Sequence, residues 1–271
     1  MERSKPFGRP GKDKAESVSE NRRTAWDERA REFSEHAASA KYPEAFLRIL
    51  NPRKSWTVFD MACGGGTIAV PLADKVRRIT AVDFSPRMLE IVEQRCHMGG
   101  IANVKTIQGR WEDDWKSLGI GLHDVAIASR SLPGDDVREY IAKLDGVARK
   151  SVYISTQVGD GPFDRRLFES TGRQFDGRPD YIFYYNLLYE MGLYANVAFI
   201  PGSGRNLWES HEEALKDSRW MFPGMTDEEE GKVRAYLKEH LVPVNGGWRL
   251  PYSRNYSWAV LYWKKGGRGR R

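Results

Sequence analysis

Cysteine is scarce in this chain of 271 residues. Only Cys63 and Cys96 are present, which is too few for a disulfide framework or a cysteine-rich zinc site. Histidine offers no metal site in its place, because the spacing of the five residues fits no metal-ligand pattern. The histidines are His36, His97, His123, His211 and His240. We therefore expect no metal in the protein.

Long apolar runs are also missing. No run approaches the roughly 20 residues that span a bilayer, and the charged residues 1–6 precede no apolar segment. We expect neither a membrane span nor a secretory signal, which leaves the reducing cytoplasm as the default compartment. Aromatic residues make up 12% of the chain, too many for a disordered protein. The composition predicts a soluble globular protein with one large domain, or one domain with an insertion.

The excess of positive charge is confined to the two ends. Residues 1–14 and 264–271 carry net charges of +3 and +5, whereas the whole chain carries +6, so the residues between them carry −2. A basic surface for nucleic acid is therefore expected only on the terminal arms. Nucleic acid is a possible partner of these arms but not the favoured one.

From Trp56 onward, short apolar runs alternate with amphipathic stretches, the pattern of a parallel sheet flanked by helices. The expected strands are Thr57–Met61, Ile79–Val82, Val104–Gln108, Val125–Ala128 and Ser151–Ser155. The expected helices are Arg22–Ala37, a short one after Pro43, Thr67–Lys75, Pro86–Cys96 and Asp135–Ala148, with at most a short one over Glu112–Leu118.

The second half of the chain is richer in aromatic residues, because 21 of the 32 follow Ser151. We expect further helices at Asp180–Met191, Glu209–Arg219 and Thr226–Leu241, and strands at Asn196–Ile200 and Ser257–Trp263. The resulting organisation is a flexible basic arm (1–20), lid helices (21–55), a core (56–200), a helical cap (201–255), a last core strand (256–264) and a basic tail (265–271).

The most informative segment is Asp60-Met61-Ala62-Cys63-Gly64-Gly65-Gly66, a strand end followed by three glycines. Glycines at a strand-to-helix turn let a ligand approach the backbone, and the absence of Lys-Ser or Lys-Thr excludes a P-loop. Asp60 would repel a pyrophosphate but attract an ammonium group. Asp83 ends the next strand, where a carboxylate can accept both hydroxyls of a ribose. An amino acid joined to a nucleoside satisfies both positions.

This segment, together with Ala81-Val82-Asp83-Phe84-Ser85-Pro86-Arg87-Met88, resembles class I S-adenosylmethionine-dependent methyltransferases over residues 22–156. The resemblance implies a Rossmann-like α/β fold with a seven-stranded, mostly parallel sheet, flanking helices and N-terminal lid helices. The family normally has a hairpin before the last strand, so the long stretch from Pro201 to Arg254 predicts an added helical insertion there. The resemblance also implies S-adenosylmethionine as cofactor. The implied cofactor-binding residues are Asp60, Ala62, Cys63, Gly64, Gly66, Asp83, Phe84, Met88, Arg110, Trp111, Glu112 and Ser129.

Two positions depart from the family pattern. Arg110 stands where an acid usually accepts the adenine amino group, and arginine cannot accept a hydrogen bond, so adenine recognition is expected to pass to the backbone of Trp111 and to Glu112. Ala62 replaces the first glycine of the loop, and Cys63 reads as a small loop residue with no histidine near it in sequence.

The acceptor side is less specific. Arg130 follows the fourth strand, where it could bind an acidic acceptor, steady the cap or simply be solvated. In the helix at 180–191, core packing is the majority explanation for the tyrosines, with a minority lining a pocket. The candidate substrate residues are Trp26 and Phe33 of the lid helix, Arg130, Tyr181, Tyr184 and Tyr185.

The sequence therefore predicts methyl transfer to a small-molecule acceptor by direct displacement, in an aromatic, capped pocket. The catalytic residue stays unknown, and candidate bases are a tyrosine within 181–189, Tyr252, Tyr256 and Glu190. The alternatives are an RNA methyltransferase that uses the basic tails, and a binding protein that holds S-adenosylmethionine without catalysis. A nicotinamide-dependent oxidoreductase comes last because of Asp60.

Overall fold

A computed structural model describes residues 41–132, 136–175 and 179–266. The expected helix Arg22–Ala37, with Trp26 and Phe33, lies outside these ranges. The chain forms two compact units: the first extends to Ile127 and includes Val147–Arg149, and the second comprises Ala128–Gly146 and the residues from Lys150 onward. No helix among the described residues has the length and apolar character needed to cross a membrane.

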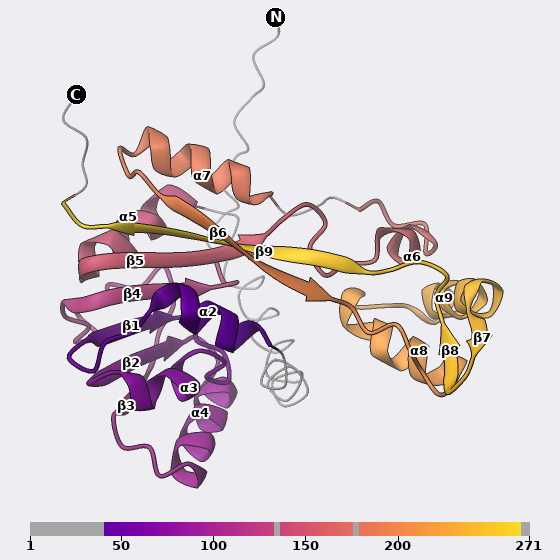
Figure 1. Cartoon of the computed structure of the whole chain (residues 1–271), viewed down its shortest axis with the longest axis horizontal. Coiled ribbons are helices and arrows are strands. Elements are labelled where there is room, and N and C mark those ends of the chain that lie inside the picture. Colours follow the sequence, from indigo (N-terminus) through magenta and orange to yellow (C-terminus); the bar gives the residue numbers. More distant parts are fainter. Residues whose placement is uncertain (1–40, 133–135, 176–178, 267–271) are drawn as a thin grey trace, which may run out of the picture. The chain divides into compact units, whose positions relative to one another are not determined.

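Seven strands form one sheet in the order β3-β2-β1-β4-β5-β9-β6 (Figure 1). Parallel pairing joins β1 to β2 and β4, and β2 to β3, whereas β9 lies antiparallel between β5 and β6. The strands are β1 Thr57–Met61, β2 Arg78–Asp83, β3 Val104–Gln108, β4 His123–Ser129, β5 Ala148–Gln157, β6 Asn196–Ser203 and β9 Asn255–Lys264. The predicted Rossmann-like, mostly parallel sheet is confirmed.

In the first unit, the central strands carry continuous apolar runs because both of their faces are covered. All five residues of β1 are buried, as are the last five of β2. The helices are α2 Tyr42–Leu50, α3 Ala69–Leu72, η1 Ala73–Lys75 and α4 Pro86–Met98. Helix α4 begins where expected, because the Ser85 hydroxyl accepts the Met88 N–H at 3.1 Å and Pro86 occupies the first turn.

Two expectations for this unit need correction. The helix expected over Thr67–Lys75 is only the short α3 and η1, because Pro71 has no N–H to donate to the Thr67 carbonyl. Residues 112–118 form turns and no helix. There the Asp114 carboxylate accepts the Lys116 N–H at 3.1 Å, a side-chain bond that competes with helix formation.

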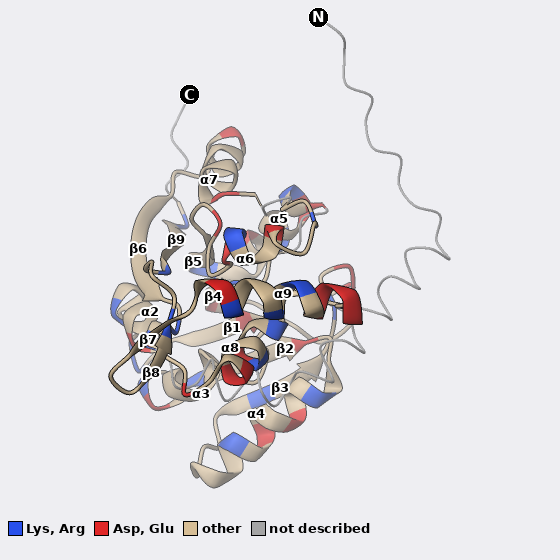
Figure 2. Cartoon of the chain, turned by 90° about the vertical axis from the view of Figure 1, so that its right-hand side faces the viewer, with Lys and Arg blue, Asp and Glu red and all other residues tan. Residues whose placement is uncertain are grey.

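The second unit contains a helical insertion between β6 and β9. The insertion contains α8 His211–Ser218, η2 Arg219–Met221, α9 Asp227–His240 and a hairpin of β7 Val242–Val244 and β8 Gly247–Arg249. The other helices of the second unit precede β6 and are α5 Val137–Val147, α6 Arg165–Glu169 and α7 Tyr181–Glu190. Helix α9 begins with a capping box between Thr226 and Glu229 and an acidic first turn (Figure 2).

The insertion has its own hydrophobic core. Trp208, Leu215, Phe222 and Leu237 are buried together, and Leu167 of α6 joins them. Helix α6 and the β7–β8 hairpin are not among the elements that the sequence predicts. The core of the insertion is therefore built partly from residues that precede β6.

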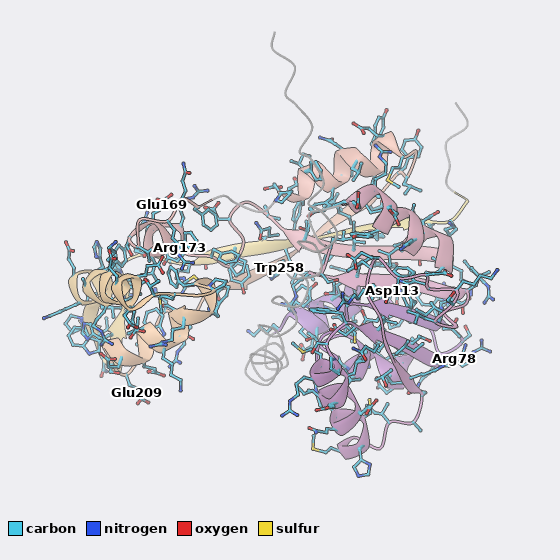
Figure 3. All side chains as sticks on the ribbon, turned by 180° about the vertical axis from the view of Figure 1, so that it is seen from behind. Arg78, Asp113, Glu169, Arg173, Glu209 and Trp258 are labelled. Atoms are coloured by element: carbon cyan, nitrogen blue, oxygen red, sulfur yellow. The ribbon has the colours of Figure 1, made fainter. Side chains whose placement is uncertain are left out.

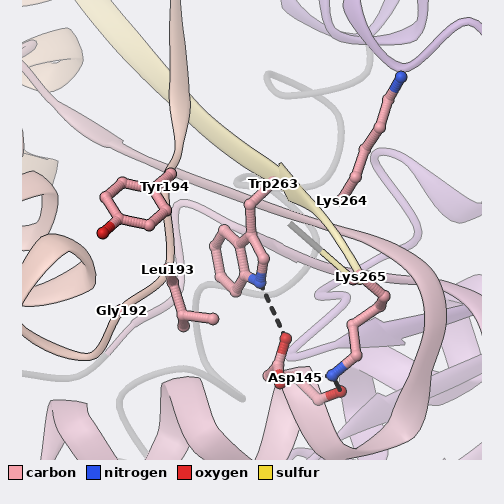
Figure 4. A pocket seen from close by; sticks show the side chains of 8 residues that line it. Asp145, Gly192, Leu193, Tyr194, Trp263, Lys264 and Lys265 are labelled. Carbon is pink, nitrogen blue, oxygen red and sulfur yellow. Dashed lines mark hydrogen bonds and ion pairs between the residues drawn. The ribbon is translucent and has the colours of Figure 1, made fainter. Parts of the chain in front are cut away.

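A buried polar group joins α5 to the end of β9 within the second unit. The Asp145 carboxylate accepts the indole N–H of Trp263 at 2.9 Å and pairs with the Lys265 ammonium (Figure 4). The small cavity beside it is lined by these residues and by Leu193 and Tyr194. Because its polar groups are already paired with one another, we regard this cluster as structural.

Candidate functional site

The turn after β1 has an unusual backbone. Ala62, Gly64 and Gly66 have φ angles of +52°, +54° and +79°, in the left-handed region that glycine adopts without penalty and other residues do not. Ala62 therefore carries a backbone strain of about 1 kcal/mol at the position where the family pattern has glycine. Strain of this kind is characteristic of ligand-binding turns.

The two flanking glycines serve different purposes. A side chain at Gly66 would lie 2.7 Å from Val70 and 3.3 Å from Val92, so its absence lets α4 pack directly against the turn. A side chain at Gly64 would have no atom within 4 Å. Open space therefore lies beside Gly64, where a ligand can approach the backbone.

Asp83, the last residue of β2, ties this turn to the neighbouring strand. One carboxylate oxygen accepts the Gly64 N–H at 2.8 Å and the other accepts the Ser85 N–H at 3.0 Å. The Gly64 N–H is thus engaged by Asp83 before any ligand arrives. Each carboxylate oxygen has two acceptor positions, so Asp83 retains capacity to accept hydroxyl groups.

Asp60 lies on β1 with 1% of its surface exposed. Within the described part of the chain its Oδ2 atom is buried and has no hydrogen-bond partner. Burial, together with the neighbouring charge of Asp83, raises the pKa of Asp60 to about 8. A buried carboxylate in this situation is stabilised by a cation placed against it.

Cys63 lies between these carboxylates in the turn. Its N–H donates to the Val82 carbonyl at 3.0 Å, and burial, followed by the charges of Asp83 and Asp60, raises the pKa of its thiol. A thiol that resists ionisation is a poor nucleophile. The structure agrees with the interpretation of Cys63 as a loop residue.

Asp113, which is not among the predicted site residues, closes the turn that follows β3. The Asp113 carboxylate accepts the Arg110 N–H at 2.8 Å, and the Trp115 indole donates to the Arg110 carbonyl at 3.0 Å. Trp111 is buried, whereas Glu112 is exposed. The signal for Asp113 was its position three residues after Arg110, the spacing at which an aspartate side chain closes a local turn.

The other predicted adenine-side residues lie at the start of α4. Met88 is 2% exposed and Phe84 is half-buried. The Gln108 amide donates to the Phe84 carbonyl at 3.2 Å, which fixes the backbone that leads into the helix. The turn, Asp83 and the start of α4 all belong to the first unit.

A family model described as a methyltransferase domain matches residues 58–150. Over 244 residues, 88% of each chain, the sequence is 30% identical to an uncharacterized protein of Haemophilus influenzae. The chain belongs to the class I S-adenosylmethionine-dependent methyltransferases. Its cofactor is S-adenosylmethionine.

More distant relatives of this methyltransferase differ in their acceptors. A demethylmenaquinone methyltransferase of Geobacillus kaustophilus is 27% identical over 197 residues, covering 68% of this chain and 71% of its own. An uncharacterized RNA methyltransferase of Oceanobacillus iheyensis is 27% identical over 129 residues, which cover 46% of this chain and 28% of the relative's own length. A putative methyltransferase of Bacillus halodurans has the same fold, with a TM-score of 0.59 at 14% identity over 83% of this chain and 99% of its own.

Residues of the second unit follow the fourth strand of the methyltransferase. Ser129 ends β4, and its hydroxyl lies 3.4 Å from that of Ser155 on β5. Arg130 has a φ of +59°, and its N–H donates to the carbonyl and the hydroxyl of Ser155, both at 3.0 Å. The Arg130 guanidinium carbon lies 5.4 Å from the ring centre of Trp258, which Figure 3 labels. Both ends of Arg130 are therefore held, its backbone by β5 and its charge by an indole.

Helix α7 is buried along part of its surface and exposed along the rest. Tyr184 and Leu188 are buried, whereas Tyr181 and Tyr185 are half-buried. The Tyr181 ring meets Phe199 edge-on, with ring centres 5.3 Å apart. Apolar residues occur on every side of this helix, so the sequence does not single out the face that packs.

Two of the candidate bases have partners that argue against the role. The Tyr252 hydroxyl donates to the Asp164 carboxylate at 3.0 Å, and burial, followed by its hydrogen bond with Tyr236, raises its pKa. Glu190 is exposed and pairs with Arg138 at 2.9 Å. Neither arrangement favours removal of a proton from an acceptor.

Proposed function

We propose that the protein transfers the methyl group of S-adenosylmethionine to a small-molecule acceptor. The bound cofactor supplies an electrophilic methyl group on its sulfonium, and the chain's task is to orient it and exclude water. The observation that carries the site assignment is the buried, unpartnered Oδ2 of Asp60 beside Asp83. An ammonium group placed there favours the ionised form of a carboxyl group that burial otherwise keeps protonated at neutral pH.

In this proposal Asp60 holds the amino group of the methionine moiety and Asp83 accepts the ribose hydroxyls. Ala62, Cys63, Gly64 and Gly66 form the backbone turn, and Phe84 and Met88 flank the adenine. The segment from Arg110 to Glu112, closed by Asp113, forms the far side of the base. Ser129, at the end of β4, completes the cofactor site, and Arg130 belongs to the acceptor side.

The choice of a small molecule is supported by how far the relatives align. The demethylmenaquinone methyltransferase aligns over 71% of its own length, whereas the RNA methyltransferase aligns over 28%. The excess positive charge lies in the terminal arms. We further propose that the helical insertion covers the acceptor, with Trp26, Phe33, Tyr181, Tyr184 and Tyr185 as candidate contacts, and that the protein acts in the cytoplasm.

Calorimetry with S-adenosylmethionine and S-adenosylhomocysteine tests the cofactor site. We expect wild-type protein to bind both, and Asp83→Ala to lose binding because the turn and the ribose hydroxyls lose one acceptor. Asp74→Ala, which removes an exposed acid in the same unit, is the matched control. Wild-type affinity in Asp83→Ala would show that the site is assigned wrongly.

An RNA acceptor is the second candidate because RNA methyltransferases occur among the relatives. Filter binding with labelled RNA separates the two, using full-length protein and a variant without residues 1–14 and 267–271, which keeps β9 and the ion pair between Lys265 and Asp145. The small-molecule proposal expects weak binding that the deletion abolishes and that salt suppresses. Tight, salt-resistant binding followed by methyl incorporation into RNA would replace it.

A further inference from the structure

Arg95 lies in the last turn of α4, thirty residues from the glycine turn in sequence. Its guanidinium Nη1 donates to the Gly65 carbonyl at 2.6 Å. The side chain is half-buried, and burial lowers its pKa. Partial withdrawal of a guanidinium from water is unfavourable unless the bond that it makes compensates the loss.

Gly65 is buried, so its carbonyl needs a partner within the protein. Two N–H groups of the turn have partners of their own: the Gly66 N–H donates to the Cys63 carbonyl at 3.1 Å, and the Gly64 N–H donates to the Asp83 carboxylate at 2.8 Å. Arg95 supplies a bond from the helix side. It is thus the side-chain donor that couples the turn to α4.

Three consecutive glycines lose more conformational freedom than any other tripeptide when they become ordered. A ligand that has to order such a turn binds more weakly than one that meets it already ordered. The close approach of Val92 to Gly66 already places α4 against the turn. The Arg95 bond adds direction, because it fixes which way the Gly65 peptide group faces.

We propose that Arg95 is a positioning residue for the cofactor: it holds the glycine turn in its binding conformation before the cofactor arrives. The proposal rests on the proposed function, because it assigns the turn to S-adenosylmethionine. Arg95 acts only through the Gly65 carbonyl. Its contribution to cofactor affinity therefore has to be measured beside its contribution to the stability of the fold.

The test uses the full-length protein with Arg95→Met, which keeps an apolar stem and removes the donors. Arg95→Lys retains the positive charge and N–H donors on a shorter side chain. Arg87→Met is the matched control on the same helix, since Arg87 is exposed and pairs with Glu90 at 2.8 Å, within the first turn of the helix and away from the glycine turn's carbonyl groups. For each protein we measure the Kd for S-adenosylhomocysteine by calorimetry, the thermal midpoint, and amide hydrogen exchange of residues 62–67 without ligand.

We expect Arg95→Met to raise the Kd about tenfold, the effect of one lost charge-assisted hydrogen bond, and to speed exchange in the turn. Arg95→Lys should fall between it and the wild type, and Arg87→Met should match the wild type. A lower thermal midpoint with unchanged Kd would overturn the proposal. If Arg95→Met does not fold, an unchanged Kd in Arg95→Lys together with faster exchange overturns it.

Failure of the proposed function gives a different result. Wild-type protein that binds neither S-adenosylmethionine nor S-adenosylhomocysteine would contradict the cofactor site itself. The exchange measurement needs no ligand, so it still decides whether Arg95 orders the turn: equal exchange in wild type and Arg95→Met refutes that role.

Discussion

Replacing Asp60 with asparagine should strengthen the fold and weaken cofactor binding at the same time. Folding moves the pKa of this carboxyl from 3.8 to about 8. At pH 7, where the unfolded chain would release the proton, keeping Asp60 in the fold costs about 4 kcal/mol, at about 1.36 kcal/mol per pH unit. Asparagine has a similar shape and no proton to lose, so it avoids this cost.

The pH dependence has a definite sign. Because the folded pKa of Asp60 lies above the unfolded one, its contribution to stability is complete below pH 3.8 and is lost as the pH rises toward 8. Asp60→Asn should therefore gain on the wild type steadily between pH 4 and 8. Urea denaturation of the ligand-free proteins across this range measures the difference.

Binding should respond in the opposite direction. An ammonium group of the cofactor placed against Asp60 favours the ionised carboxylate, so wild-type protein at pH 7 should release close to one proton on binding. Calorimetry in buffers of different ionisation enthalpy counts that proton. Asp60→Asn should release none and bind on the order of 100-fold more weakly, because an amide leaves the ammonium without a counter-charge.

Two results would refute this reasoning. Parallel stability curves for wild type and Asp60→Asn between pH 4 and 8 would mean that Asp60 is not a proton-bearing buried carboxyl. Wild-type affinity in Asp60→Asn would mean that no cation lies against it. Asp74→Asn, an exposed acid with 72% of its side chain accessible, should change neither quantity.

Three further predictions concern stability. Asp164→Ala should lower the free energy of unfolding, measured by urea denaturation, by about 3–5 kcal/mol, because it leaves the buried Arg254 side chain, 3.6 Å away, without its carboxylate. If Arg254→Ala lowers it equally and the effects of the two substitutions simply add in the double variant, this prediction is contradicted. The pKa of His123 is lowered by burial, so stability should fall as the pH drops below its unfolded value of 6.5, and His123→Gln should flatten that part of the curve. Ala62→Gly should raise the thermal midpoint by relieving a φ of +52°, and a lower midpoint would show that the turn is not strained.

The sheet and the glycine turn were readable from sequence because their signals are local. The run of apolar residues at Thr57–Met61, the three glycines and the serine before Pro86 each specify a conformation within a few positions. Asp60 and Asp83 come together because parallel neighbouring strands bring their carboxyl ends to one edge. The register between β1 and β2 determines how close the two carboxylates lie: Asp60 pairs with Ala81, two residues before Asp83.

Other parts depend on partners far away in sequence. Helix α6 has five residues and is stabilised by the packing of Leu167 into the core of the insertion. A helix this short depends on such distant packing, which the local sequence does not predict. The bond between Arg95 and Gly65 spans thirty positions, and an arginine on a helix reads by default as solvated. The face of α7 that packs was undetermined because the helix is apolar all round.

The two ends of the helical insertion are partners in the same ladder. Ser203 at the end of β6 pairs with Asn255 at the start of β9, and the Gly204 N–H donates to the Arg254 carbonyl at 2.7 Å. The chain thus leaves and re-enters the sheet at one point, as a short hairpin would. Such an excursion can be exchanged for another of different length without moving any strand, at an entropic cost that grows only slowly with length. The insertion is therefore a module that can be replaced as a whole, provided that α6, which shares its core, is exchanged with it.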